Sequence, residues 1–205
     1  MIRHDIDSDP MYVLKWLEIQ QKYGIHSSFY FRLCTVNLDV MRKVAESGSD
    51  CGYHYEELAD YVKKHHILKK EEALQQLPAI QAQFKQNFRE LEQRCGFKIK
   101  YIASHGDFAN RKIGIQNHQL ITREVMNECG IVFEAYQKEF TDTYSINISD
   151  RGYPVFYKGE ISPEHAIEKG IERIHLLMHP KHWRSSLYWN SYENLKRAWE
   201  GVKYR

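Results

Sequence analysis

The sequence lacks several features that would define a class of protein at once. It contains no run of the roughly 18 to 20 apolar residues that a membrane-spanning helix needs, and its N-terminus shows no basic-then-apolar signal sequence. A net charge of +2 provides no strong field to attract nucleic acid or an anionic membrane surface. We therefore expect a globular protein with no membrane span and no nucleic-acid partner.

Cysteine is also scarce, and the four cysteines show no Cys-x-x-Cys spacing. A structural zinc site is therefore the least favoured interpretation, because such sites are commonly closed by four ligands and rich in cysteine. The chain shows no internal repeat, low-complexity tract or linker. Its 205 residues, 42% of them hydrophobic, suit a single domain over residues 1–205. The cysteine usage favours a reducing compartment, and we expect the cytoplasm.

Short apolar runs alternate with longer helical patterns, which is typical of βα units around a parallel sheet or barrel. The runs predict strands at residues 2–7, 27–33, 50–55, 101–105, 131–135, 145–148 and 174–179. Helices are predicted at residues 10–22, 38–46, 69–94 with an interruption at Pro78, 118–129 and 192–199, with a loop over residues 106–116. The pattern places the protein in the α/β class.

Unusual polar residues fall at or just past the C-terminal ends of the predicted strands. They are Asp5, Asp7, Arg32, His54, Glu56, His105, Glu134 and His179. In parallel α/β architectures that edge carries the active site. We therefore take these residues as candidates for one functional site.

The segment Arg3-His4-Asp5-Ile6-Asp7 is the most informative of these. Alternate side chains of a strand share a face, so Asp5 and Asp7 point the same way. Two carboxylates this close favour a bound cation, which lets one carboxylate ligate while the other stays an ionised proton acceptor. A structural alternative is a helix cap, but Ser8-Asp9-Pro10 supplies that cap and explains Asp9 better than the other two.

Three further residues are candidates for holding the cation. His54 offers an imidazole, and Glu56, which shares its face, either ligates or orients a ligand. His105 ends its strand before Gly106, where a metal or substrate can approach the backbone closely. Each histidine alone is equally compatible with a structural hydrogen bond, and the choice between His105 and Glu56 as third ligand stays open.

The last predicted strand ends at His179-Pro180-Lys181-His182-Trp183. An imidazole at that position can act as a general acid, with His182 as a substitute for His179. Trp183 can stack on a sugar ring or cover the barrel mouth. Arg32 can bind acyl or acidic groups of a substrate, and Glu134 is assigned to substrate binding or to support of the ligands.

In order and placement, these motifs resemble the polysaccharide deacetylase (NodB-homology) superfamily. Arg-His-Asp-x-Asp with Gly-Tyr-His-Tyr-Glu is similar to its WbmS-like subgroup. The resemblance implies a distorted (β/α) barrel of about seven strands. It implies Asp5 as catalytic base, Asp7 and His54 as metal ligands and His179 as acid. The superfamily's second histidine falls on Leu58, which cannot bind metal, so His105 or Glu56 completes the site or the site is impaired.

The resemblance further implies a divalent metal, zinc before cobalt, nickel or manganese. The expected reaction is removal of an acyl group from an N-acylated sugar or glycan precursor for cell-surface polysaccharide. The alternative is a degenerate member that binds a glycan or sugar nucleotide without turnover. The missing second histidine favours that alternative, whereas a base and an acid together favour an enzyme. The oligomeric state stays open.

Overall fold

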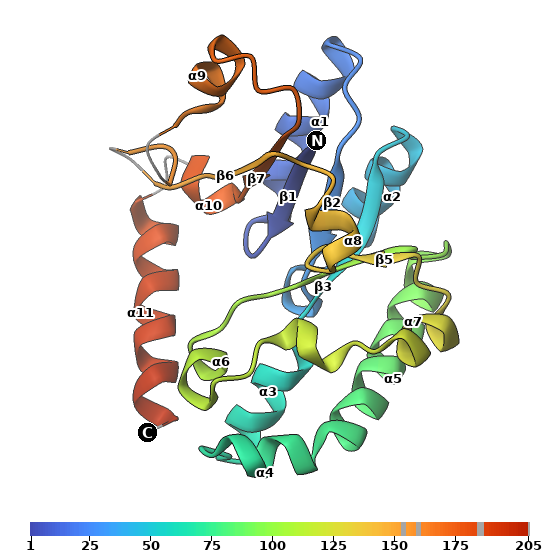
Figure 1. Ribbon diagram of the computed structural model, residues 1–205, viewed down its shortest axis with the longest axis vertical. Helices are drawn as coiled ribbons and strands as arrows, with labels where there is room; N and C mark the ends of the chain where they lie inside the picture. The colour runs from blue at the N-terminus through green and yellow to red at the C-terminus, as the bar shows by residue number, and fades with distance from the viewer. Residues whose placement is uncertain (153–154, 159–160, 184–186, 205) are drawn as a thin grey trace.

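Seven parallel strands form one curled, open sheet at the centre of the computed structural model, which describes residues 1–152, 155–158, 161–183 and 187–204 (Figure 1). In chain order the strands are β1 (Ile2–Ile6), β2 (Ser28–Phe31), β3 (Asp50–Tyr55), β4 (Tyr101–Ser104), β5 (Phe133–Glu134), β6 (Ile146–Ser149) and β7 (Ile174–Met178). Their order across the sheet is β5-β4-β3-β2-β1-β7-β6, and every pairing is parallel. The prediction of a distorted seven-stranded α/β barrel is confirmed.

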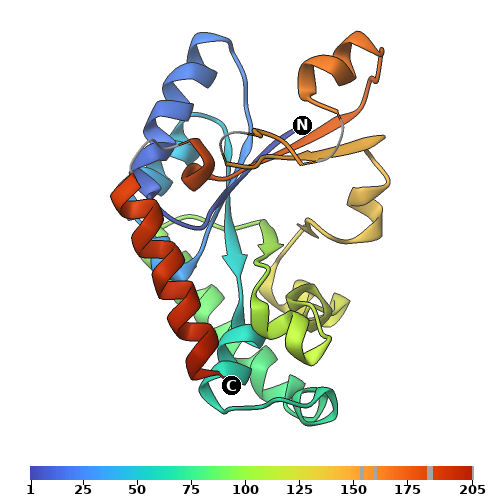
Figure 2. The same cartoon turned by 90° about the vertical axis from the view of Figure 1, so that its left-hand side faces the viewer.

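Helices connect the strands, as the alternating pattern predicts. They are α1 (Val13–Lys22), α2 (Leu38–Glu46), α3 (Glu57–Lys64), α4 (Lys70–Gln75), α5 (Leu77–Cys95), α6 (Phe108–Ile113), α7 (Arg123–Cys129), α8 (Lys138–Thr141), α9 (Pro163–Glu168), α10 (Pro180–Trp183) and α11 (Leu187–Lys203). Short 3₁₀ turns lie at Pro10–Tyr12, Leu33–Thr35 and Asn117–Leu120. In Figures 1 and 2, α11 runs along one side of the molecule.

Several helix boundaries differ from the predicted ones. The predicted loop over residues 106–116 is wrong, because α6 forms there: the Asp107 carboxylate accepts a hydrogen bond from the backbone of Ala109, and Gly114 ends the helix with φ at 71°. The predicted helix over 118–129 is divided, since Thr122 caps a separate α7. The final helix extends well beyond residues 192–199 in both directions.

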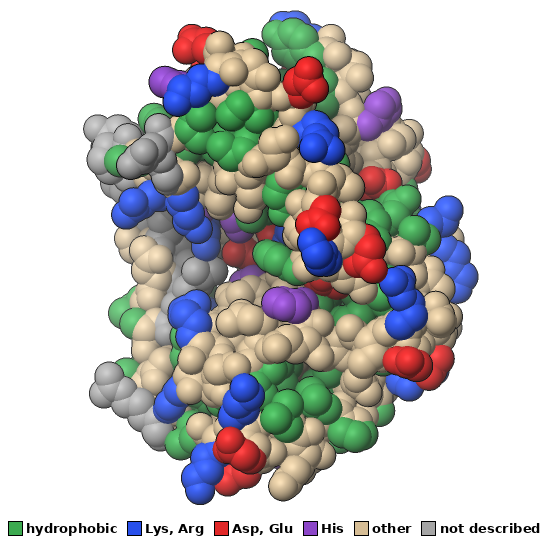
Figure 3. All heavy atoms as spheres, in the orientation of Figure 1, with side chains coloured by type: hydrophobic (Ala, Val, Ile, Leu, Met, Phe, Trp, Pro, Cys, Tyr) green, Lys and Arg blue, Asp and Glu red, His purple; other side chains and the backbone are tan. Residues whose placement is uncertain are grey.

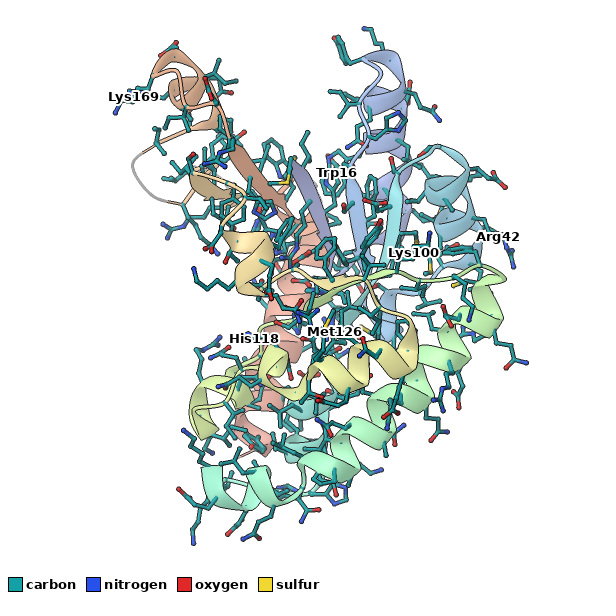
Figure 4. All side chains as sticks on the ribbon, turned by 45° about the vertical axis from the view of Figure 1, so that its right-hand side comes forward. Trp16, Arg42, Lys100, His118, Met126 and Lys169 are labelled. Atoms are coloured by element: carbon teal, nitrogen blue, oxygen red, sulfur yellow. The ribbon has the colours of Figure 1, made fainter. Side chains whose placement is uncertain are left out.

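The core lies between the sheet and the helices that cover it. Helix α5 buries Ile80, Phe84, Phe88 and Leu91, which recur every three or four residues and so form one face. Figure 4 shows Trp16 of α1 directed toward the sheet, while Arg42 and Lys169 point outward. Each fully buried large side chain contributes about 1.5–3 kcal/mol. No helix in the described ranges is both long and apolar enough to cross a bilayer.

One acidic side chain is buried in this core without an ionic partner. Glu57, at the start of α3, accepts hydrogen bonds at one oxygen from Tyr53 and Asn87, while its other oxygen is buried and has no hydrogen bond. Burial raises the pKa of the Glu57 carboxyl from 4.5 to about 7. Between these two values the folded chain retains a proton that the unfolded chain has released.

We therefore expect the free energy of unfolding to fall as the pH rises from about 4.5 to about 7, because the folded state binds more protons there. The loss is on the order of 3 kcal/mol, at about 1.4 kcal/mol per unit of pKa shift. Glu57→Gln should flatten this part of the profile, as measured by urea unfolding across that range. Glu128→Gln, at an exposed position of α7, is the control and should keep the wild-type slope. An unchanged slope in Glu57→Gln would contradict the assignment.

Candidate metal and catalytic site

The register of the sheet brings the candidate residues to one edge. Ile6 of β1 pairs with Phe31 of β2, and Phe31 pairs with Tyr53 of β3. Tyr55 pairs with Ser104 of β4, and on the other side of β1, His4 pairs with Met178 of β7. The residues that follow these pairs therefore meet at the C-terminal edge of the strands, as predicted for Asp5, Asp7, Arg32, His54, Glu56, His105 and His179.

Three of these residues come together at this edge, namely Asp7, His54 and His105. All three are buried, and their ligand atoms lie within 4.8 Å of one another. The Asp7 Oδ1 atom lies 3.3 Å from His54 Nε2 and 3.5 Å from His105 Nε2. Two imidazole nitrogens and a carboxylate oxygen are the donor set of many open zinc sites, so these residues fit a divalent cation.

The surroundings of both histidines aim Nε2 at Asp7. The Nδ1 atom of His54 lies 2.9 Å from the carbonyl oxygen of Ala103, which can only accept, so Nδ1 carries a hydrogen and Nε2 is the nitrogen that faces Asp7. The Nδ1 atom of His105 lies 3.0 Å from Glu56 Oε2. Outer partners of this kind orient metal-binding imidazoles. Nε2 of His105 thus faces Asp7, and Glu56 lies on the Nδ1 side of the same ring.

The carboxylates of Asp7 and Glu56 strongly affect the protonation of His105. Burial lowers the pKa of His105, but the Asp7 carboxylate and then Glu56 outweigh it and raise that pKa to about 9. A cation that binds here competes with this proton. Lys181 of α10, which the sequence analysis did not select, has its Nζ 3.6 Å from Asp7 Oδ2.

Arg32 is engaged with Glu56. Its Nε and Nη2 atoms donate to the two Glu56 oxygens at 2.8 and 2.7 Å, and Nη1 lies 3.4 Å from the Asp7 carbonyl oxygen. Burial raises the pKa of Glu56, but its hydrogen bond with His105 and the charge of Arg32 lower it to about 2. The structure thus places Arg32 where it holds Glu56 ionised against His105, and its predicted substrate role stays a prediction.

Asp5 lies beside this group and is held by Arg3. The Nε and Nη2 atoms of Arg3 donate to the two Asp5 oxygens, each at 2.7 Å, and Asp5 Oδ2 lies 3.5 Å from His54 Nε2. Burial alone would raise the pKa of the Asp5 carboxyl, but the charge of Arg3 holds it below its ordinary value. The carboxylate is therefore ionised at neutral pH. Arg3 was not selected, although its spacing of two from Asp5 puts it on the same strand face.

His179 is oriented by Asp150, a fully buried residue directly after β6 that the sequence analysis missed. The Asp150 Oδ1 atom lies 2.7 Å from His179 Nδ1, and Oδ2 accepts from the His179 backbone at 2.7 Å. Burial raises the pKa of Asp150, but its contacts with His179 and His182 lower it well below the ordinary value. The strand-end rule applied to residue 150 would have found it.

Trp183 and Glu134 lie outside the donor group. Trp183 Nε1 donates to Asp150 Oδ2 at 2.8 Å, so its indole helps to fix the carboxylate that orients His179. Glu134 is buried at the sheet edge, where it accepts from the backbone of Ser104 at 3.1 Å and of Tyr136 at 2.7 Å. The structure thus gives Glu134 a backbone-bracing position between β4 and β5.

A pocket of about 950 Å³ opens from the donor group toward α11. Asp7, Arg32 and His105 line one side of it, and Tyr192 and Lys196 of α11 line the other. Figure 3 shows the hollow beside α11, with acidic and histidine side chains at its inner wall. This volume accommodates a small organic substrate in reach of the buried donors.

No protein-family model and no curated protein matches the sequence. Among solved structures, the chain is similar to a mutant described as a CE4 family pseudoenzyme with restored enzymatic activity, a form of BA3943, with a TM-score of 0.48 and 14% identity. Wild-type BA3943 from Bacillus anthracis, described as a CE4 family pseudoenzyme, gives a TM-score of 0.47 and 14% identity. These matches cover 87% of this chain, which spans about half the length of each matched chain: 55% of the mutant and 53% of the wild type.

Proposed function

We propose that this protein is a divalent-metal-dependent amide hydrolase that removes an acyl group from an N-acylated sugar or glycan precursor. In this proposal it acts in the cytoplasm as a WbmS-like member of the polysaccharide deacetylase superfamily. The metal is zinc, held by Asp7, His54 and His105. The observation that carries the proposal is the convergence of three buried donors beside an ionised carboxylate, Asp5, which lies next to an imidazole, His179, at the same edge of the sheet.

The residues around the donors divide the chemistry between them. When bound, a dication polarises an amide carbonyl and lowers the pKa of water. Asp5, kept ionised by Arg3, accepts the proton of the attacking water. His179, whose Nδ1 is fixed by Asp150, donates a proton to the leaving amine, which is too basic to depart as an anion.

The two proton-handling groups lie on adjacent strands. Because His4 pairs with Met178, the next residues, Asp5 and His179, sit beside each other at the edge of the sheet. A base and an acid so placed suit the two proton transfers of one hydrolysis, one from the attacking water and one to the leaving amine. Binding without turnover requires neither group.

Leu58 bears on the alternative of binding without turnover. The superfamily's second histidine would fall on this residue of α3, whose side chain is fully buried in the apolar core. His105 reaches the donor group from β4 instead. The absence of a histidine at position 58 therefore leaves the donor set with three members, and the argument for a degenerate site loses its main support.

The test is the metal content of purified wild-type protein beside His105→Ala and Glu56→Ala. We expect near-stoichiometric metal in the wild type and its loss in His105→Ala. Glu56→Ala, which removes the outer partner of His105 and the counter-ion of Arg32 but none of the three proposed ligands, should weaken affinity by about 10- to 100-fold. Loss in Glu56→Ala with retention in His105→Ala would make Glu56 the ligand. A wild-type protein that binds no added divalent metal would overturn the proposal in favour of binding without turnover.

A further inference from the structure

Helix α11 carries a row of large apolar side chains that are more than half exposed in the described part of the structure. Tyr188, Tyr192, Leu195, Trp199 and Val202 are 71%, 53%, 72%, 61% and 56% exposed, respectively. We call these five residues the α11 stripe. Scattered single apolar residues on a surface are ordinary, but a contiguous row of this size marks an interaction site.

The spacing of the stripe identifies the kind of surface it matches. Successive members are separated by four, three, four and three residues, an average of 3.5. This is the repeat of the narrow contact line between two packed α-helices in a coiled coil. Leu195 and Val202 also offer no flat ring on which a sugar could stack, so the row suits a helix better than a glycan.

The anchoring of α11 sets the direction of the stripe. Tyr204 is buried, its hydroxyl donates to the carbonyl oxygen of Ile67, and its own carbonyl oxygen accepts from Lys112 Nζ at 3.0 Å. Tyr204 lies two positions after Val202, and two positions correspond to about 200° around an α-helix. The anchored side of α11 therefore faces the body of the protein. The stripe lies on the other side of the helix, with Tyr192 and Val202 at the border of the pocket, and α11 itself runs along one side of the molecule in Figures 1 and 2.

We propose that the α11 stripe is a dimer interface in which α11 of a second copy of this chain packs antiparallel across it. The exposed surface of the five residues is roughly 700 Å² per copy, close to the ~800 Å² per partner of a stable specific interface. A two-fold axis lets the same surface cover itself, so no other partner is required.

The antiparallel direction follows from the ends of the stripe. With Leu195 on the two-fold axis, Tyr188 of one copy lies opposite Val202 of the other, so a large side chain meets a smaller one. Parallel pairing would set Tyr188 against Tyr188. It would also place Lys196 and Lys203, which flank the stripe, beside their own counterparts, and like charges repel.

Tyr192 and Val202 also border the pocket, so the second copy would form part of its rim.

Sedimentation velocity over a range of concentrations tests the interface. We expect wild type to sediment as a dimer at micromolar concentration and Leu195→Glu as a monomer, since the substitution buries two like charges at the axis. Ile167→Glu, at a similarly exposed position on α9, is the matched control and should remain dimeric. A wild type that is monomeric at about 100 μM, or a dimeric Leu195→Glu, would overturn the proposal.

Cross-linking tests the direction of the helices independently. In a Cys34→Ser, Cys129→Ser background, Leu195→Cys should form a disulfide-linked dimer on mild oxidation, because the two copies of residue 195 meet at the axis. Tyr188→Cys in the same background should not, because antiparallel helices set residue 188 against residue 202, whereas parallel helices would set it against its own counterpart. Ile167→Cys, away from the interface, should not cross-link in either case. A dimer that cross-links through residue 188, or one that fails to cross-link through residue 195, would contradict the antiparallel arrangement.

Discussion

Replacing Asp5 by asparagine is expected to lower turnover by about 10²- to 10⁴-fold while leaving the metal content unchanged. The asparagine side chain has nearly the same shape, but its amide cannot accept a proton from water at neutral pH. The three proposed ligands are untouched, so metal binding should survive. Steady-state kinetics and metal analysis on the same sample measure the two effects separately.

The design must allow for Arg3, which loses its counter-ion in this variant. A buried unpaired guanidinium costs stability, so thermal unfolding should be recorded beside the kinetics. Asp50→Asn is the matched control, since Asp50 begins β3 at the opposite end of the sheet and its carboxylate accepts a hydrogen bond from the Ser28 hydroxyl. A folded, metal-replete Asp5→Asn protein with full activity would rule out Asp5 as the base.

Asp7→Ala is expected to abolish both metal binding and turnover. Asp7 contributes the only carboxylate among the three proposed donors, and its oxygen lies between the two imidazoles. Without it, two neutral imidazoles remain, and we expect affinity for a dication to fall by more than the roughly 10- to 100-fold seen when only an outer partner is lost. Equilibrium dialysis against a divalent metal, with activity on an N-acylated sugar, gives both readouts.

Asp107→Asn separates two overlapping groups of donors. Glu56, His105 and Asp107 also lie close enough together to hold a cation. Asp107, however, caps α6 and accepts from Lys63 Nζ at 3.0 Å, so its oxygens are already engaged. We expect Asp107→Asn to retain metal. Loss of metal there, with retention in Asp7→Ala, would move the site to the second group.

The placement of the site could be predicted because it depends on two simple rules. Alternation along β1 puts Asp5 and Asp7 on one face, and parallel strands bring their C-terminal ends to one edge. The third ligand could not be predicted this way. Whether His105 or Glu56 faces Asp7 depends on the register of β3 against β4 and on the partner that each ring nitrogen meets, which only the three-dimensional structure shows.

The features that the sequence analysis did not predict depend on contacts with other parts of the chain. Helix α6 was predicted as a loop because its stretch contains Gly106 and Asn110, yet capping by Asp107 and burial of Ile113 stabilise it. Lys181 approaches Asp7 only because β7 lies next to β1. The outward stripe of α11 could be read as helical periodicity, but periodicity does not show whether such a face is covered.

The position of β1 has a consequence for the nascent chain. This first strand lies between β2 and β7, and the amino group of Met1 donates to the carbonyl oxygen of Ile174 at 2.8 Å. Asp7, His54 and His105 all precede His179 in the chain and are therefore synthesised before it. Since chains fold progressively as they are made, the ligand set can capture a metal before the acid arrives. A chain would then bind its metal before it becomes able to catalyse the reaction.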